Sequence, residues 1–141
     1  MEKKKRIFFI SGHRDITNEE FSELYKPAIL KAISLYDALF LIGDYYGVDI
    51  MAQNYLVDEL NYDTEKITVY HMGVTPMNIN EKITNRVPNF SDDIARDSAM
   101  TRNSNEDIAF IRVGKEDSGT AQNILRRVTF TNENNHIKKL V

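Results

Sequence analysis

Short apolar runs alternate with longer amphipathic segments along this chain. Each apolar run has the length and composition of a buried β-strand, and together they cover residues 7–10, 38–42, 67–70 and 108–111. Between them apolar side chains recur at helical spacing, which predicts helices over residues 17–33 and 49–60, from residue 91 and from residue 120. This alternation is typical of a mainly parallel sheet with helices on both faces.

Two of the predicted helices begin at recognisable capping residues. Thr17 is followed three residues later by Glu20, which is the capping-box pattern. Ser91 precedes Asp92 and Asp93, so acidic side chains stand in the first turn of the third helix. Both patterns indicate where a helix begins.

The segments outside this pattern are less regular. Residues 72–90 contain Pro76 and Pro88 and are long for a loop of a compact domain, so a lid or binding loop is expected. We expect the polar run 131–135 to be a connection and residues 136–141 to be a closing edge strand. The predicted fold class is α/β: a Rossmann-like, doubly wound sheet of four or five mainly parallel strands, forming a single domain over residues 1–141.

Charge and composition narrow the classes of partner. The 18 basic and 21 acidic residues give a formal net charge of −3, whereas a nucleic-acid binder usually carries a basic stripe. The basic runs at 3–6 and 138–139 are terminal, and a solubilising role explains them better than nucleic-acid contact. The three histidines lack metal-ligand spacing and the chain has no cysteine, so we expect no metal site.

The cellular compartment is predicted from the absence of membrane-span, signal-peptide and cysteine patterns in the sequence. No apolar stretch approaches the roughly 20 residues of a membrane span, and the N-terminal residues do not contain the apolar core of a signal peptide. A chain without cysteine suits a reducing compartment. We therefore expect a cytoplasmic protein with neither membrane nor nucleic acid among its partners.

Three loops that follow predicted strands carry the candidate chemistry. The carboxyl ends of parallel strands share one edge of the sheet, where doubly wound proteins bind their ligands. Glycines there let backbone N–H groups approach a ligand, and helix N-termini favour an anion such as a phosphate. The candidate ligand-binding residues are Ser11, Gly12 and Arg14 in the first loop, Gly43, Gly47 and Asp49 in the second, and Asp117, Ser118, Gly119 and Thr120 in the third.

Further candidates stand between and beside these loops. Asp44 either faces the pocket or is a solvated turn residue that caps a nearby amide. Tyr45 and Tyr46 either stack on a base or cover the edge of the sheet. Arg96, early in the third predicted helix, is placed at the same edge, where a guanidinium grips phosphate with two hydrogen bonds.

The motifs and their order resemble the SLOG superfamily. These Rossmann-like proteins include the "lonely guy" cytokinin-activating phosphoribohydrolases. The similarity extends to about residue 128 and rests on "ISGHRD", "IGDYYGVDIMA", "ARDSAM" and "DSGT". The second motif of small SLOG domains, G-x-x-x-G-x-D-x-x-A, is matched by Gly43, Gly47, Asp49 and Ala52, their R-x-x-x-M by Arg96 and Met100, and their G-T by Gly119 and Thr120.

Two departures separate this chain from the phosphoribohydrolases. Their phosphate loop reads P-G-G-x-G-T-x-x-E, whereas residues 115–118 here are Lys-Glu-Asp-Ser, and Asn123 stands where the acidic residue is expected. An amide cannot act as the carboxylate of glycosidic cleavage. The resemblance therefore implies nucleotide binding more directly than it implies that activity.

Functions from different classes follow from these observations. The first is a nucleotide-binding enzyme that cleaves the N-glycosidic bond of a nucleoside monophosphate or related ligand, with Asp44 and Glu116 as catalytic carboxylates and Arg96 holding the phosphate. The second is a non-catalytic nucleotide sensor or sequestering protein, and a structural domain with a vestigial pocket is a third. A small nucleotide is the expected partner, no cofactor is expected, and the resemblance implies a homodimer or higher homo-oligomer.

Overall fold

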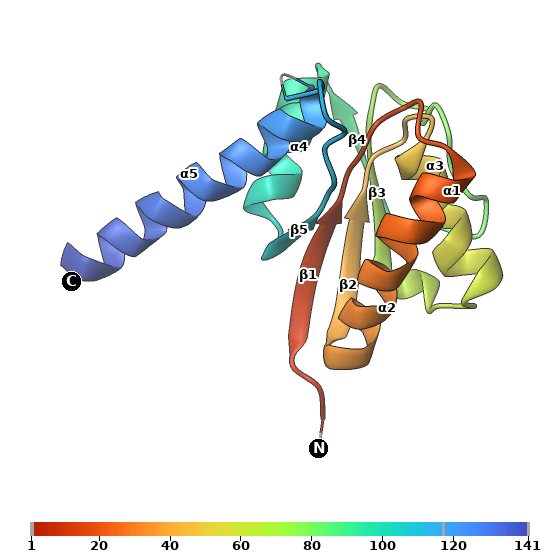
Figure 1. The fold of residues 1–141 in the computed structure, drawn as a ribbon, viewed down its shortest axis with the longest axis horizontal. Coiled ribbons are helices and arrows are strands. Elements are labelled where there is room, and N and C mark those ends of the chain that lie inside the picture. The colour runs from red at the N-terminus through yellow and green to blue at the C-terminus, as the bar shows by residue number, and fades with distance from the viewer. Residues whose placement is uncertain (1, 117, 141) are drawn as a thin grey trace.

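The computed structural model describes residues 2–116 and 118–140, with side chains described as far as residue 129. Within these residues the strands form one parallel sheet (Figure 1). Its order is β4-β3-β2-β1-β5, and every neighbouring pair is parallel. The strands are β1 (Lys5–Ile10), β2 (Asp37–Ile42), β3 (Ile67–Met72), β4 (Arg86–Phe90) and β5 (Glu106–Ile108). The α/β class and the parallel Rossmann-like sheet are thus confirmed.

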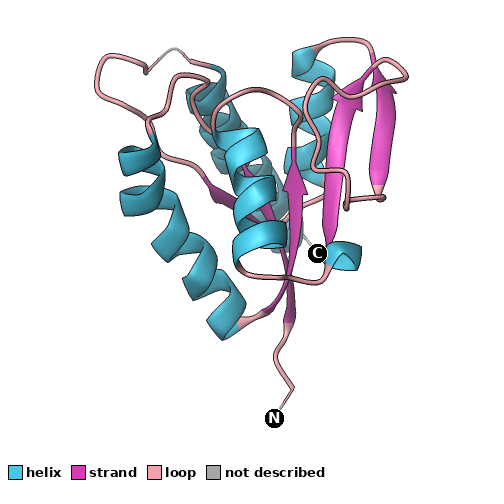
Figure 2. Cartoon of the chain, turned by 90° about the vertical axis from the view of Figure 1, so that its right-hand side faces the viewer, coloured by secondary structure: helices cyan, strands magenta, loops and turns pink. Residues whose placement is uncertain are grey.

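Helices cover both faces of this sheet. Figure 1 shows α4 and α5 on one side of the strands and α1, α2 and α3 on the other, and Figure 2 shows the strands running in one direction between helices. The helical segments are α1 (Asn18–Glu20), η1 (Phe21–Tyr25), α2 (Lys26–Leu35), α3 (Val48–Asn54), η2 (Tyr55–Glu59), η3 (Thr64–Lys66), α4 (Asp93–Arg102) and α5 (Gly119–Leu140).

Alternate side chains of the central strands enter two separate cores. Phe8 and Ile10 of β1 are buried in the larger cluster, which also contains side chains of η1, α2 and α3. Phe9, between them in the sequence, belongs to the second cluster with Ala99 and Met100 of α4. This is the two-residue period of a strand that is covered on both faces, and it explains why the strand reads as a continuous apolar run.

The predicted helix starts are close to the observed ones. Thr17 and Glu20 form the expected capping box, since the Glu20 amide donates to the Thr17 hydroxyl at 3.1 Å and the Thr17 amide donates to the Glu20 carboxylate at 3.0 Å. At α4 the cap is Asp92 rather than Ser91, because the Asp92 carboxylate accepts from the Ala95 amide at 2.7 Å.

Two strands differ from the prediction. β5 spans Glu106–Ile108 rather than 108–111, because its pairing with Phe8–Ile10 of β1 ends at Ile108. β4 lies inside the segment predicted as a loop, pairs only with β3, and contains Pro88 and a register shift. A polar sequence with a proline is tolerated there because β4 is an edge strand.

The predicted C-terminal connection and edge strand are wrong. Residues 131–135 and 136–140 instead continue α5, which runs for 22 residues from Gly119 to Leu140. No glycine or proline occurs between residues 120 and 140 to end the helix, and polarity alone does not stop one. In Figure 1, α5 extends away from the sheet, so its far end lies well outside the body of the domain.

Candidate functional site

A cavity of about 370 Å³ opens where the parallel strands end. Its walls come from the loops that follow β1 and β2, from α4, and from the loop and first turn of α5. The chain proceeds outward from β1 through β2 and β3 to β4 and then returns to the opposite side of β1 as β5. The cavity therefore lies beside the reversal of strand order, which is the expected ligand position in a doubly wound sheet.

Most of the predicted site residues line this cavity. They are Ser11, Gly12, Arg14, Gly43, Asp49, Arg96, Ser118, Gly119 and Thr120. Asp44, Gly47 and Glu116 do not line it, and Asp117 lies outside the described residues. The three predicted loops are thus brought together, although not with every side chain in the expected place.

Arg96 is held by the carboxylates around it. Its Nη1 donates to Asp44 Oδ1 at 3.1 Å, its Nε donates to Asp97 Oδ1 at 3.1 Å, and its Nη2 lies 3.4 Å from Asp93 Oδ1. Although burial opposes the charge, the surrounding carboxylates keep the pKa of Arg96 above its ordinary value. The guanidinium is therefore engaged with the protein's own acids, rather than standing ready as a phosphate ligand.

The carboxylates predicted to be catalytic do not line the cavity and have partners within the protein. Asp44 is buried, and besides Arg96 it accepts a hydrogen bond from the Met77 amide at 2.7 Å. Glu116 is exposed and accepts from the Gly114 amide at 3.1 Å. Neither group lines the cavity, and Asp44 is a buried ion-pair partner of Arg96 rather than the solvated turn residue of the alternative interpretation.

The glycines of the first two loops are required by packing within the protein. A Cβ on Gly43 would lie 2.6 Å from Asp49 Oδ2, and one on Gly12 would meet the Val48 and Tyr25 side chains. Gly47 has a φ of +72°, and a Cβ there would press on the carbonyl oxygens of residues 13 and 14. These contacts explain the glycines without a ligand, and a close approach of ligand to backbone remains a prediction.

Asp49 is the most strongly perturbed acid of the site. Burial raises its pKa to about 7, although the Tyr45 amide and the Arg96 charge favour the ionised form. The Tyr45 N–H donates to Asp49 Oδ2 at 3.1 Å. The carboxyl group of Asp49 therefore changes charge near neutral pH at the wall of the cavity.

Two further acids of α4 line the cavity and were not predicted. Asp93 and Asp97 stand four residues apart, and so lie on one face of the helix. Burial raises the pKa of Asp97, while the neighbouring Arg96 and Asn123 side chains act in the opposite direction. Together with Asp49, these two acids make one wall of the cavity acidic. In the sequence, the four-residue spacing of the two acids in "DIARD" around Arg96 could have indicated them.

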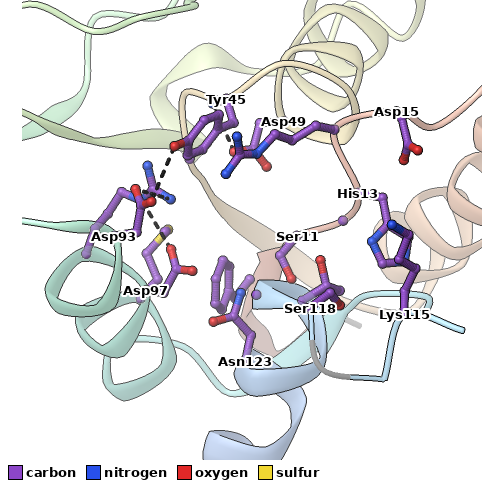
Figure 3. Close-up of a pocket in the computed structure, with 18 residues that line it drawn as sticks. Ser11, His13, Asp15, Tyr45, Asp49, Asp93, Asp97, Lys115, Ser118 and Asn123 are labelled. Atoms are coloured by element: carbon purple, nitrogen blue, oxygen red, sulfur yellow. Dashed lines mark hydrogen bonds and ion pairs between the residues drawn. The ribbon is translucent and has the colours of Figure 1, made fainter. Parts of the chain in front are cut away.

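The opposite wall presents hydrogen-bond donors. Ser118 caps α5, because its hydroxyl accepts from the Ala121 amide at 3.2 Å, and the first N–H groups of a helix have no acceptor within it. Ser11 is only 6% exposed, and its hydroxyl has no hydrogen-bond partner among the described residues. Figure 3 shows Ser118 and Lys115 on the side of the cavity away from Asp93 and Asp97.

Tyr45 covers the acid–arginine cluster. The Arg14 and Arg96 guanidinium carbons lie 4.1 and 5.3 Å from the centre of its ring, within cation–π range. Its hydroxyl lies 3.3 Å from Asp93 Oδ2. These contacts favour the covering interpretation for Tyr45, whereas Tyr46 is 59% exposed and does not line the cavity.

His13 also lines the cavity and was not among the predicted ligand residues. Its Nε2 accepts a hydrogen bond from the Arg112 amide at 2.9 Å. Burial and the Arg112 charge lower the pKa of His13. A neutral ring therefore joins the loop after β1 to the segment after β5, and it adds no positive charge to the cavity near neutral pH.

Residues 72–90 do not form the expected lid over this cavity, since none of them lines it. The Met77 amide and the Asn78 side chain donate to Asp44, and the Asn80 amide donates to the Gln53 side chain at 2.8 Å. Ile83 is buried in the larger core. The segment is therefore anchored against the β2–α3 region.

Comparisons of this chain with protein-family models, curated proteins and solved structures find no match. Among the described residues no cluster of histidines and acids is arranged to hold a metal ion. Within that same part of the chain, no helix combines the length and apolar character needed to cross a bilayer. The function must therefore be argued from the cavity itself.

Proposed function

We propose that this protein binds a nucleotide in the cavity at the carboxyl edge of its sheet, with the phosphate at the N-terminus of α5. The cavity is polarised, because Asp49 of α3 and Asp93 and Asp97 of α4 lie on one side of it. Ser118, Lys115 and the first turn of α5 lie on the other side, where Asp15 is paired with Arg112. An anionic group is favoured at the second wall by the helix dipole and by unshared N–H groups.

The observation that carries this proposal is the Ser11 side chain. A buried hydroxyl without a partner is uncommon, because its desolvation is not compensated. Ser11 lines the cavity together with Gly119 and Thr120 of α5. An oxyanion placed among these groups would accept the Ser11 hydrogen bond. The resemblance to SLOG proteins supports the same assignment independently of this geometry.

Binding is tested with purified protein and a panel of nucleoside 5′-monophosphates, with the matching nucleosides as phosphate-free controls. A monophosphate at 100 times its dissociation constant should stabilise the fold by about 2.7 kcal/mol, and the nucleoside should do so less. Thermal unfolding measures the shift. If no nucleotide in the panel raises the melting temperature, the proposal is wrong.

The position of the phosphate is tested with Ser11→Ala. Loss of one hydrogen bond to the charged phosphate, about 1.5–3 kcal/mol, should weaken monophosphate binding roughly tenfold to hundredfold. Ser34→Ala is the matched control, since Ser34 is exposed on α2 and does not line the cavity. Calorimetry showing equal affinities for both variants would place the phosphate elsewhere.

A second candidate function is cleavage of the N-glycosidic bond of the bound nucleotide. Asp49, Asp93 and Asp97 favour it, because they supply carboxylates to the cavity that Asp44 and Glu116 do not. In such a reaction a carboxylate takes a proton from water. The water oxygen bonds to the anomeric carbon as the C–N bond breaks, and the base leaves with the electrons of that bond and the proton that the carboxyl group took from water. Chromatography that detects no free base after hours with saturating nucleotide would leave the non-catalytic binder.

Self-association and a cytoplasmic location remain proposals. The resemblance to SLOG proteins favours a homodimer formed through helices, and Leu30 and Leu35 of α2 are exposed apolar side chains that suit such a contact. Light scattering at tens of micromolar protein, a concentration at which weak homodimers populate, should report the mass of a dimer. A monomer mass at that concentration would remove this proposal.

A further inference from the structure

We propose that the acidic wall of the cavity, and Asp97 in particular, accepts hydrogen bonds from the ribose hydroxyls of the ligand, so that the site selects ribonucleotides over 2′-deoxyribonucleotides. This inference rests on the proposed nucleotide binding. It adds the class of sugar and the residue that recognises it.

The orientation of the ligand follows from charge. Asp49, Asp93 and Asp97 line one wall of the cavity. Arg96 lies among them and is already paired with Asp44, Asp93 and Asp97, so the acids outnumber the charge that it supplies and a phosphate beside them would be repelled. The donors of α5 and the unpartnered Ser11 hydroxyl lie at the other wall. A ligand whose phosphate is at α5 must therefore present an uncharged part to the acids, and hydroxyl groups are the uncharged donors that complement carboxylates.

Asp97 is the acid best prepared for this contact. Its side chain is 14% exposed, compared with 43% for Asp93, so water competes less for it. Arg96 Nε donates to its Oδ1 at 3.1 Å and fixes the carboxylate. An ionised carboxylate has about four acceptor positions, so its hydrogen bond from Arg96 leaves room for hydroxyl donors.

The neighbours of Asp97 fit this role. Asp93, one turn earlier, accepts from the Tyr45 hydroxyl through Oδ2 at 3.3 Å. Its Oδ1, 3.4 Å from Arg96 Nη2, has no hydrogen-bond partner among the described residues, so it can add an acceptor to the acidic wall. Asn123 on α5 is 3% exposed and lines the cavity beside Asp97. Arg96 thus acts as a positioning residue, because it holds the carboxylates that would meet the sugar.

The test compares the binding of ribose 5-phosphate with that of 2-deoxyribose 5-phosphate, because neither compound contains the unidentified base. The comparison is then repeated with ribo- and deoxyribonucleoside 5′-monophosphates. Calorimetry on the full chain should give a ribose compound that binds about 10-fold to 100-fold more tightly. This is the ratio expected for a hydrogen bond to a charged group. Affinities equal within twofold in the wild-type protein would overturn the inference.

Asp97→Asn should reduce this ratio toward one, and it should weaken the binding of the deoxyribose compounds less than that of the ribose compounds, because the former lack the 2′-hydroxyl and keep the 3′-hydroxyl. Asp58→Asn is the matched control, because Asp58 is an exposed acid outside the cavity, and it should keep the wild-type ratio. An unchanged ratio in Asp97→Asn would overturn the role of Asp97. Because the ratio in wild-type protein needs no variant, the inference stays testable if Asp97→Asn does not fold.

The two proposals fail differently. If no nucleotide and no sugar phosphate binds, nucleotide binding is wrong and the sugar preference fails with it. If nucleotides bind but 2′-deoxy compounds bind equally well, nucleotide binding stands and only the ribose inference fails.

Discussion

Replacing Asp49 by asparagine should remove a pH dependence from the stability of the protein. Asp49 is buried, and burial raises its pKa to about 7, well above the value near 3.9 of an unfolded chain. Between these two values the folded state holds a proton that the unfolded state has lost. The stability contributed by this proton is therefore fully present below about pH 4 and is lost as the pH rises toward 7.

The size of the effect between two convenient pH values follows from the same pKa. From pH 5 to pH 8 the wild-type protein should lose about 2.7 kcal/mol of unfolding free energy through Asp49, which is two pKa units at roughly 1.36 kcal/mol each. Asp49→Asn keeps an oxygen for the Tyr45 amide, which donates to Asp49 Oδ2 at 3.1 Å, but it cannot ionise. Its stability relative to wild type should therefore rise by this amount across the interval.

Urea unfolding of both proteins at pH 5 and pH 8 measures this double difference, in which the titration of other groups cancels. Asp37→Asn is the control: a hydrogen bond from Lys66 lowers the pKa of Asp37, so its ionisation is complete throughout the interval. A difference between Asp49→Asn and wild type that does not change from pH 5 to pH 8 would show that Asp49 ionises normally, and the burial argument would fail.

Three other substitutions test the local structure. Gly47→Ala should destabilise the fold by about 1–3 kcal/mol, because Gly47 has a φ of +72° and a Cβ would press on backbone carbonyls. Gly114 has a φ of +88° in open space, so Gly114→Ala should lower the unfolding free energy less, as measured by the same chemical denaturation. Thr17→Ala should lower the unfolding free energy by about 1 kcal/mol through loss of the capping box, and an unchanged midpoint would contradict this. Arg96→Ala should destabilise the fold by about 3–5 kcal/mol, since it leaves the 5% exposed Asp44 without its charged partner. If calorimetry shows that this variant unfolds near the wild-type temperature, the ion pair contributes little to stability.

The central strands were predictable because burial on both faces leaves a continuous apolar run. Residues 7–10, 38–42 and 67–70 lie within β1, β2 and β3. β4 gives no such signal, since three of its five residues are polar or proline and none of the five is fully buried. Its only pairing is with β3. The end of α5 was missed because a polar run without glycine or proline reads equally as a connection or as an exposed helix.

The site was predictable only at the level of loops. Glycines and helix starts located the edge, but the sequence does not reveal which acid of "GDYYGVD" points inward. Asp49 lines the cavity, whereas Asp44 turns toward Arg96 and Met77. Asp93 and Asp97 look like ordinary polar residues of an exposed helix, and only the packing of α4 brings them to the cavity. The i, i+4 spacing of these two acids places them on one face of the helix, but it does not show that this face meets the cavity.

The edges of the sheet affect how copies of this chain meet. An open edge strand with free N–H and C=O groups is a template for pairing with another molecule, and so for aggregation. Here β5 is only three residues long. At the other edge, β4 carries Pro88, which has no N–H to donate, and its pairing with β3 is irregular. Both edges thus resist growth of the sheet into a fibre, and helical faces are left as the surfaces through which copies can associate.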